Sequence, residues 1–367
     1  MQMYIGLDVH SKQTVYVAQD ETGKVRGEGA VATSWDGLCE LLARLAAPAG
    51  TPMALETGTQ AMWVARLLSG LEMTPVVLDA REVRAKARRI GQKSDRRDAF
   101  ELCDGLRRGI YQTKVYVPDA ATLRLRAILS RRRHFVTVAV REINSAKFVL
   151  RAVGLSTAAA TLTTTAAWEK LLARPAAAGL RDHLAMHAAV WRLAREQVAK
   201  LEAELAEAMV PFAAPAARLA TTMGVGPITA ATFVAVLGTP ARFPDSHAVV
   251  SYLGLAPSTY DSGEQERHGT ITKRGSSELR SLLCEAAQHT RRVRHPLHPY
   301  WAKLAATKGY RKAIVAGAAR LARILWRLWR DDCDFDVKKL NVVEERRRRA
   351  KTTYYRLRTA DEARQRA

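Results

Sequence analysis

The chain has 367 residues, with 58 lysines and arginines against 36 aspartates and glutamates, and a formal net charge of +22. This length exceeds one ordinary domain and predicts two or three, each able to bury a core. So large a positive excess favours a partner with a phosphate backbone over a neutral or basic one.

Other broad classes receive no support. No apolar run reaches the roughly 18 residues of a membrane span, and the start, Met1-Gln2-Met3-Tyr4, lacks the plan of a signal peptide. The four cysteines lie far apart, without the spacing of a zinc site or a disulfide framework. They are Cys39, Cys103, Cys284 and Cys333. We therefore expect a cytoplasmic protein with no membrane partner.

The first third of the chain predicts an α/β layer fold. Extended stretches separated by polar turns predict a hairpin sheet over Met3 to Val9, Thr14 to Ala18 and Val25 to Thr33. A longer period then predicts, in order, a helix over 35–45, a strand over 53–56, a helix over 61–71 and a strand over 75–78. Hairpin strands followed by strand–helix alternation indicate a mixed sheet.

A basic run follows over residues 81–98. It holds eight lysines and arginines against three acids. Such a run is often only a solvated helix face, but this one leads directly into two aspartates, which favours contact with nucleic acid. The candidate contacts here are Arg84, Arg88, Arg89, Lys93, Arg96 and Arg97.

The remainder is predominantly helical in pattern. Apolar residues at helical spacing predict two long helices, over 120–153 and 182–209, that form a coiled-coil arm. The Ala/Thr-rich segment 157–167 has side chains too small to build a core and is expected to be a loop or tip. We predict domains at 1–112, 113–214 and 215–330, followed by a basic tail over 331–367, exposed and disordered without a partner.

Four acids mark a candidate metal site. Asp8 closes an apolar strand, where a carboxylate is costly unless it is paired or metal-bound. Glu56 ends a later strand, and Asp95 and Asp98 stand three apart on one face of a helix. Carboxylates are the ligands of Mg²⁺, and two such ions can activate an oxygen nucleophile and neutralise a scissile phosphate. His10 is more simply read as a polar turn residue than as a general base, and we leave it outside the site.

These acids occur in three ordered motifs. They are Gly6-Leu7-Asp8-Val9-His10-Ser11, Ala54-Leu55-Glu56-Thr57-Gly58 and Lys93-Ser94-Asp95-Arg96-Arg97-Asp98-Ala99. The set resembles the RuvC-like nuclease fold of the ribonuclease H superfamily and, more narrowly, the DEDD transposases of the IS110/IS1111 insertion-sequence family. The resemblance implies that Asp8, Glu56, Asp95 and Asp98 bind catalytic Mg²⁺.

Two features of the mostly helical C-terminal region suggest phosphate chemistry. Gly224 and Gly226 form a Gly-x-Gly turn between helical patterns, either a helix-hairpin-helix-like phosphate contact or a plain tight corner. Ser262 precedes a glycine in what we expect to be an open loop. The cations expected to offset phosphate charge around it are Arg267, Lys273, Arg274 and Arg280.

The stretch from Tyr252 to Ser277 resembles the C-terminal domain of the IS110/IS116/IS902 transposases. That resemblance implies that Ser262 is a nucleophile that forms a covalent phosphoserine with DNA. It further implies donor and target DNA chosen by a structured guide RNA, the bridge or seek RNA, a homodimer or homotetramer, and a nucleoid-associated bacterial or archaeal protein. Since Ser262 lies far along the chain from the carboxylates, we predict that the N- and C-terminal domains close on one phosphate.

Two other functions stay open at this point. One is a RuvC-like, structure-specific endonuclease such as a junction resolvase, in which metal-activated water attacks and Ser262 is incidental. The other is a nucleic-acid-binding scaffold without catalysis. The scaffold would be expected to lack a metal ligand, and none of the four acids is missing.

Overall fold

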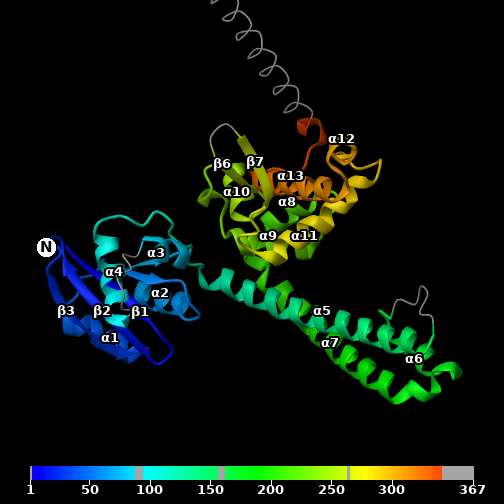
Figure 1. Ribbon diagram of the computed structural model, residues 1–367, viewed down its shortest axis with the longest axis horizontal. Coiled ribbons are helices and arrows are strands. Elements are labelled where there is room, and N and C mark those ends of the chain that lie inside the picture. The colour runs from blue at the N-terminus through cyan, green and yellow to red at the C-terminus, as the bar shows by residue number, and fades with distance from the viewer. Residues whose placement is uncertain (1, 87–93, 156–161, 263–264, 341–367) are drawn as a thin grey trace, which may run out of the picture. The chain divides into compact units, whose positions relative to one another are not determined.

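The computed structural model describes residues 2–86, 94–155, 162–262 and 265–340 (Figure 1). The chain divides into two compact units, Met1–Asp119 and Ala120–Ala367. The first holds a five-stranded sheet and the second is mostly helical. The expected combination of an α/β N-terminal part and a helical C-terminal part is confirmed at this level.

The sheet of the first unit has the strand order β3-β2-β1-β4-β5. Its strands are β1 (Met3–Val9), β2 (Gln13–Asp20), β3 (Val25–Ala32), β4 (Pro52–Glu56) and β5 (Thr74–Leu78). β1, β2 and β3 are antiparallel neighbours, whereas β4 and β5 continue the sheet in parallel with β1. The mixed sheet is therefore confirmed, and β1 is its central strand.

The two faces of the sheet are covered by different helices. α1 (Trp35–Leu45) and α2 (Ala61–Gly70) pack on the face that carries Ile5 and Leu7, which are fully buried. Because side chains alternate along a strand, Gly6 and Asp8 point to the opposite face. α4 (Asp95–Arg107) covers that face and contacts β1, β2 and β4.

Gly6 lets α4 lie directly on β1. A Cβ atom at Gly6 would stand 2.1 Å from the carbonyl oxygen of Ala99 and 2.4 Å from the backbone nitrogen of Cys103. The helix backbone thus occupies the space of a side chain. α4 begins after Ser94, whose hydroxyl accepts a hydrogen bond from the backbone N–H of Arg97. The first turn of α4 consequently lies near the end of β1.

The second unit begins with a helical arm. α5 (Ala120–Ala152) and α7 (Arg181–Ala208) pack along each other in antiparallel directions. Two ion pairs join the helices in this antiparallel arrangement, Arg132 with Glu202 at 2.7 Å and His187 with Glu142 at 2.7 Å. Between α5 and α7 in the sequence lie α6 (Thr165–Leu172) and a short 3₁₀ turn (Pro175–Leu180).

The tip of the arm has its own small core. Trp168 of α6 is buried against Trp191 of α7, with ring centroids 5.9 Å apart. Leu162 is buried in the same cluster. The expectation that residues 157–167 form a loop without a core is therefore wrong for Leu162, which is buried in this cluster, and for Thr165 to Ala167, which begin α6. Residues 156–161 lie outside the described part.

The C-terminal part of the second unit surrounds a long amphipathic helix. Its elements are α8 (Ala213–Ala220), α9 (Pro227–Leu237), α10 (Ser246–Tyr252), β6 (Pro257–Ser262), β7 (Gln265–Ile271), α11 (Ser277–Gln288), α12 (His298–Lys308) and α13 (Tyr310–Arg330). Leu321 and Leu325 of α13 are fully buried, beside Phe233 of α9. The predicted basic tail lies outside the described residues from 341 onward. Among the residues that the structure describes, no helix is long and apolar enough to cross a membrane.

Candidate functional site

The candidate site of the first unit lies where β1 and β4 end. Leu7 of β1 is paired with Leu55 of β4, so Asp8 and Glu56 follow one step later on adjacent parallel strands. Both share the face of Gly6 and Ala54, because residues two apart on a strand point the same way. That is the face covered by α4. The fold therefore brings two of the predicted acids to one edge and aims them beneath the helix that carries the other two.

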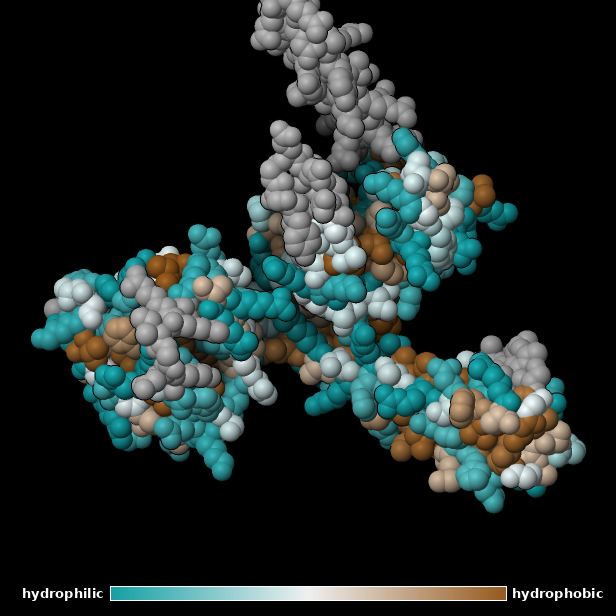
Figure 2. Space-filling model, viewed as in Figure 1, coloured by the Kyte–Doolittle hydropathy of each residue, from teal (hydrophilic) through white to brown (hydrophobic). Residues whose placement is uncertain are grey.

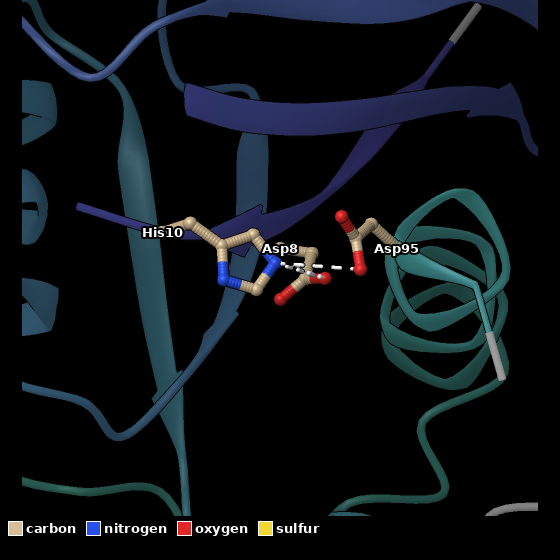
Figure 3. A group of neighbouring side chains, drawn as sticks. All are labelled: Asp8, His10 and Asp95. Atoms are coloured by element: carbon tan, nitrogen blue, oxygen red, sulfur yellow. Dashed lines mark hydrogen bonds and ion pairs between the residues drawn. The ribbon is translucent and has the colours of Figure 1, made fainter. Parts of the chain in front are cut away.

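Asp8, His10 and Asp95 form a compact group (Figure 3). The Nε2 atom of His10 is 3.1 Å from a carboxylate oxygen of Asp8 and 3.5 Å from one of Asp95. One ligand atom from each residue lies within 4.8 Å of the others. The Asp8 side chain is 19% exposed, whereas those of His10 and Asp95 are about half exposed. The group is thus open to solvent on one side.

Asp98 and Glu56 border this group. The pKa of Asp8 is raised above its ordinary value, first by partial burial and further by the negative charges of Asp98 and Asp95, while His10 opposes the shift. Asp98 is therefore close enough to act on Asp8 electrostatically. Glu56 lies 3.6 Å from a guanidinium nitrogen of Arg84.

A divalent cation fits this donor set. Three negative side chains whose charges disfavour one another are stabilised when a cation lies among them. The available ligand atoms are carboxylate oxygens with one imidazole nitrogen, and oxygen-rich sets of this kind suit hard ions. The described ligand atoms that could hold such an ion together belong to Asp8, His10 and Asp95, and Glu56 ends the adjacent strand at the same edge.

The second unit presents Ser262 on a two-stranded hairpin. Ser262 ends β6 and is paired with Gln265 of β7. The expected open loop is therefore wrong: the backbone of Ser262 belongs to a strand, since Pro257–Ser262 and Gln265–Ile271 form an antiparallel ladder. Gly263 lies outside the described residues.

At the base of this hairpin, Gly254 and Gly275 each lie against the backbone of the segment that carries the other. A Cβ atom at Gly254 would stand 2.1 Å from the carbonyl oxygen of Arg274, and one at Gly275 would stand 2.1 Å from that of Tyr252. Both glycines have positive φ, which favours glycine on its own account. Nη1 of Arg280 donates to the carbonyl oxygens of Leu253, Arg274 and Gly275. These close backbone contacts and hydrogen bonds fix the place where β6 begins and β7 ends.

Comparison with known proteins assigns both units to one family. Residues 5–154 match the model of a DEDD transposase of the IS110 type, and residues 216–302 match the model of the transposase IS116/IS110/IS902 family. The chain belongs to the IS110 family of transposases.

Individual relatives agree with this assignment. The IS110-family chain is 28% identical over 288 residues to the transposase y4qE of Sinorhizobium fredii, which covers 77% of this chain and 70% of the relative. It is 34% identical over 115 residues to the transposase of the Coxiella burnetii element IS1111A, which covers 30% of this chain and 32% of the relative. A Pseudomonas aeruginosa protein named as a family 20 transposase is 33% identical over 136 residues, 36% of this chain and 40% of its own length.

The basic residues of the IS110-family chain have varied surroundings. Arg96 makes two hydrogen bonds to Glu28 at 3.0 and 2.7 Å, and Arg97 is paired with Glu101 at 3.2 Å. Lys273 adopts a positive φ beside Gly254, and Arg280 is engaged by three carbonyl groups. Arg88, Arg89 and Lys93 lie outside the described residues, as does the side chain of Arg267.

The Gly-x-Gly turn is a tight, packed corner. Gly224 has a φ of +90°, and a Cβ there would stand 2.9 Å from the carbonyl oxygen of Ala286. Gly226 is the N-cap of α9, and Pro227 is the first residue of that helix. By contrast, no atom of the described residues lies within 4 Å of a Cβ built at Gly226.

His10 is the site residue that sequence reasoning set aside. It follows Asp8 by two positions, and its side chain turns back to Asp8 and Asp95 (Figure 3). The available signal was the spacing of two, which favours the same side of an extended chain. The sequence did not show where α4 packs on the sheet, and this packing brings Asp95 to His10 as its second partner.

Proposed function

We propose that this IS110-family protein is a DNA transposase that breaks and rejoins strands with the help of Mg²⁺ and a phosphoserine intermediate. The observation that supports the proposal is the cluster of Asp8, His10 and Asp95 at the end of the central strand. The charge of Asp98 acts on Asp8, and Glu56 ends the adjacent strand. Bound Mg²⁺, two ions in our proposal, would neutralise the scissile phosphate and lower the cost of forming an oxygen nucleophile.

Each protein residue has a defined task in this proposal. Asp8 and Glu56 are held by the sheet and Asp95 and Asp98 by α4, so four carboxylates are positioned before substrate arrives. Ser262 supplies the nucleophilic oxygen. Its Oγ–P bond forms as the bond from phosphorus to a sugar oxygen breaks; the serine proton passes to solvent, and the leaving oxygen takes one from solvent.

The second step reverses the first on a different strand. A sugar hydroxyl attacks the phosphoserine, the Oγ–P bond breaks, and the serine hydroxyl is regenerated. The phosphodiester energy is retained in the covalent link. Rejoining of the DNA strands therefore needs no nucleoside triphosphate.

The serine step is tested by trapping. Ser262→Ala should abolish the covalent protein–DNA adduct seen after denaturing electrophoresis, together with strand joining. Ser258→Ala is the matched control, because Ser258 lies on the same strand and its hydroxyl donates to the carbonyl oxygen of Thr270 at 2.9 Å. Unchanged cleavage by Ser262→Ala would instead indicate a RuvC-like endonuclease that uses water.

The metal step is tested separately. Asp8→Asn should lower Mg²⁺ or Mn²⁺ affinity in calorimetric titration and reduce cleavage by at least a hundredfold, while DNA binding persists. Asp36→Asn, in the exposed first turn of α1, changes the same charge elsewhere and should behave as the unaltered protein. Wild-type cleavage by Asp8→Asn would place the catalytic centre elsewhere, whereas DNA binding without cleavage by either protein would leave only a scaffold.

We further propose a structured guide RNA and a homo-oligomer. The positive charge supports a polyanionic partner, and we expect RNA that is encoded beside the gene to copurify with the protein.

Support for self-association comes from α7, where Met186, Val190 and Leu193 recur at helical spacing and are 67%, 43% and 55% exposed. Figure 2 shows hydrophobic surface along the arm. Light scattering should give a dimer or tetramer mass, and a monomer at working concentration would exclude it.

A further inference from the structure

A basic and aromatic hollow lies between α11 and α12, apart from the hairpin of Ser262. Its volume is about 510 Å³. It is lined by Gln288, His289, Arg291, Arg292 and Trp301. A space of this kind is large enough for one nucleobase and its sugar, and no residue assigned to the proposed chemistry lines it.

Trp301 forms the aromatic wall. Its ring lies 5.9 Å from that of His298 and 6.5 Å from that of Tyr310, the latter edge to face. The indole N–H is buried and has no hydrogen-bond partner among the residues that the structure describes. The N–H is therefore at the packed edge of the ring.

The other walls carry positive charge and an amide. The guanidinium of Arg291 lies over the Tyr310 ring at 5.2 Å, which holds that cation at the rim. Gln288 accepts a hydrogen bond from the Tyr310 hydroxyl. Arg292 is exposed, and no ion pair joins it to any described acid. Cations beside an aromatic wall are typical of sites where a base stacks and its phosphate is neutralised.

The hollow adjoins the Gly-x-Gly turn. A Cβ atom at Gly224 would stand 3.1 Å from Cβ of His289, so the turn and the hollow share this histidine. Nε2 of His295 is 3.1 Å from the carbonyl oxygen of Met223, which ties the same turn to the segment before α12. The turn therefore fixes the backbone on both sides of the hollow, at His289 and before α12.

We propose that this hollow binds one unpaired nucleotide of the nucleic acid on which the protein acts. The base stacks on Trp301, and its phosphate contacts Arg292. The inference rests on the proposed function only in taking a nucleic acid as substrate. Unpaired DNA at an exchanging strand and a looped-out base of a guide RNA share this chemistry, and the test separates them.

The test measures binding without catalysis. Hairpin duplexes that carry one bulged 2-aminopurine, or the same base paired, are made as DNA and as RNA, and are titrated in EDTA. The wild-type protein should quench the bulged base and bind the bulged hairpin more tightly than the paired one. Trp301→Leu should remove the quenching and weaken bulge binding about tenfold, with binding of the paired duplex unchanged. Trp35→Leu, at an exposed site on α1, is the control and should change neither.

A second variant guards against misfolding of the first. Arg292→Gln alters an exposed side chain and should weaken bulge binding severalfold, with the salt dependence falling by about 0.7 to 0.9 in slope. Arg192→Gln, an equal loss of charge on the exposed face of α7, should leave the bulge preference intact. Preference for only the RNA or only the DNA bulge identifies the source.

Equal affinity for bulged and paired probes, or loss of both alike in Arg292→Gln, would overturn the proposal. Its failure is distinct from that of the proposed function. Strand exchange without a bulge preference rejects only the hollow, whereas quenching without strand exchange rejects only the chemistry.

Discussion

Replacing Gly6 with alanine should separate the metal ligands without removing any of them. The new Cβ would stand 2.1 Å from the Ala99 carbonyl oxygen, where ordinary contact begins at 3.4 Å. The helix must therefore recede by roughly 1.3 Å, the difference between these distances. The opposing atoms belong to the backbone of α4 and cannot rotate away. Asp95 and Asp98, carried on its first turn, move with it.

The magnitude follows from the packing. Forced insertion of a methyl group into a filled core typically costs about 1 to 3 kcal/mol, and clashes with two backbone atoms of α4 place Gly6→Ala at about 3 kcal/mol. For a unit of this size the midpoint of thermal unfolding should fall by roughly 10 °C. A misplacement of about 1 Å can lower a catalytic rate about a hundredfold, and we expect at least that loss of metal-dependent cleavage.

The assay compares Gly6→Ala with Gly70→Ala by thermal unfolding, metal titration and cleavage rate. Gly70 ends α2 in open space, so alanine there should be neutral or stabilise by about 0.4 to 1 kcal/mol. If Gly6→Ala unfolds at the wild-type temperature and cleaves at the wild-type rate, α4 is not seated on Gly6 and the account of the site is wrong.

Two further predictions concern stability. Arg126 of α5 donates to the carbonyl oxygens of Ala235 at 2.7 Å and Val236 at 3.0 Å, so Arg126→Ala should cost about 2 kcal/mol in urea unfolding; an effect no larger than that of Arg124→Ala, whose surface ion pairs are 3.7 Å or longer, would contradict this. The pKa of Asp20 is lowered to about 2, chiefly by the Thr22 hydroxyl, so its contribution is complete above its ordinary pKa of 3.8 and is lost as pH falls toward 2. Asp20→Asn should therefore lower the melting temperature at pH 7, and its difference from wild type should shrink below pH 4; a constant difference would refute the coupling.

Local pattern predicted most of the first unit. The strand at Met3–Val9 and the helix at Trp35–Leu45 agree with their predicted bounds, and the remaining strands differ by one or two residues at an end. These elements have strong signals, because alternation and Ser34 at an N-cap act over a few residues. Asp8 and Glu56 could be identified as strand-end acids for the same reason.

Features that depend on tertiary contacts could not be predicted from the sequence. His10 acquires its importance from Asp95, which arrives through the packing of α4 on Gly6. The hairpin of Ser262 was expected as a loop, because its sequence is polar and the backbone contacts of Gly254 and Gly275 at its base join residues that are some twenty positions apart. Trp301 gave no sequence signal, since a single tryptophan is ordinary in a helix.

The division of the chain at Asp119 has a consequence for synthesis. All four acids belong to the unit that leaves the ribosome first, and domains generally fold as units in that order. At roughly 5 to 20 residues per second, translation needs on the order of ten seconds more to reach Ser262. During that interval the nascent chain carries the folded acids but lacks Ser262. If the proposed chemistry holds, a product terminated in this interval would retain the metal ligands, yet remain unable to attach itself to DNA.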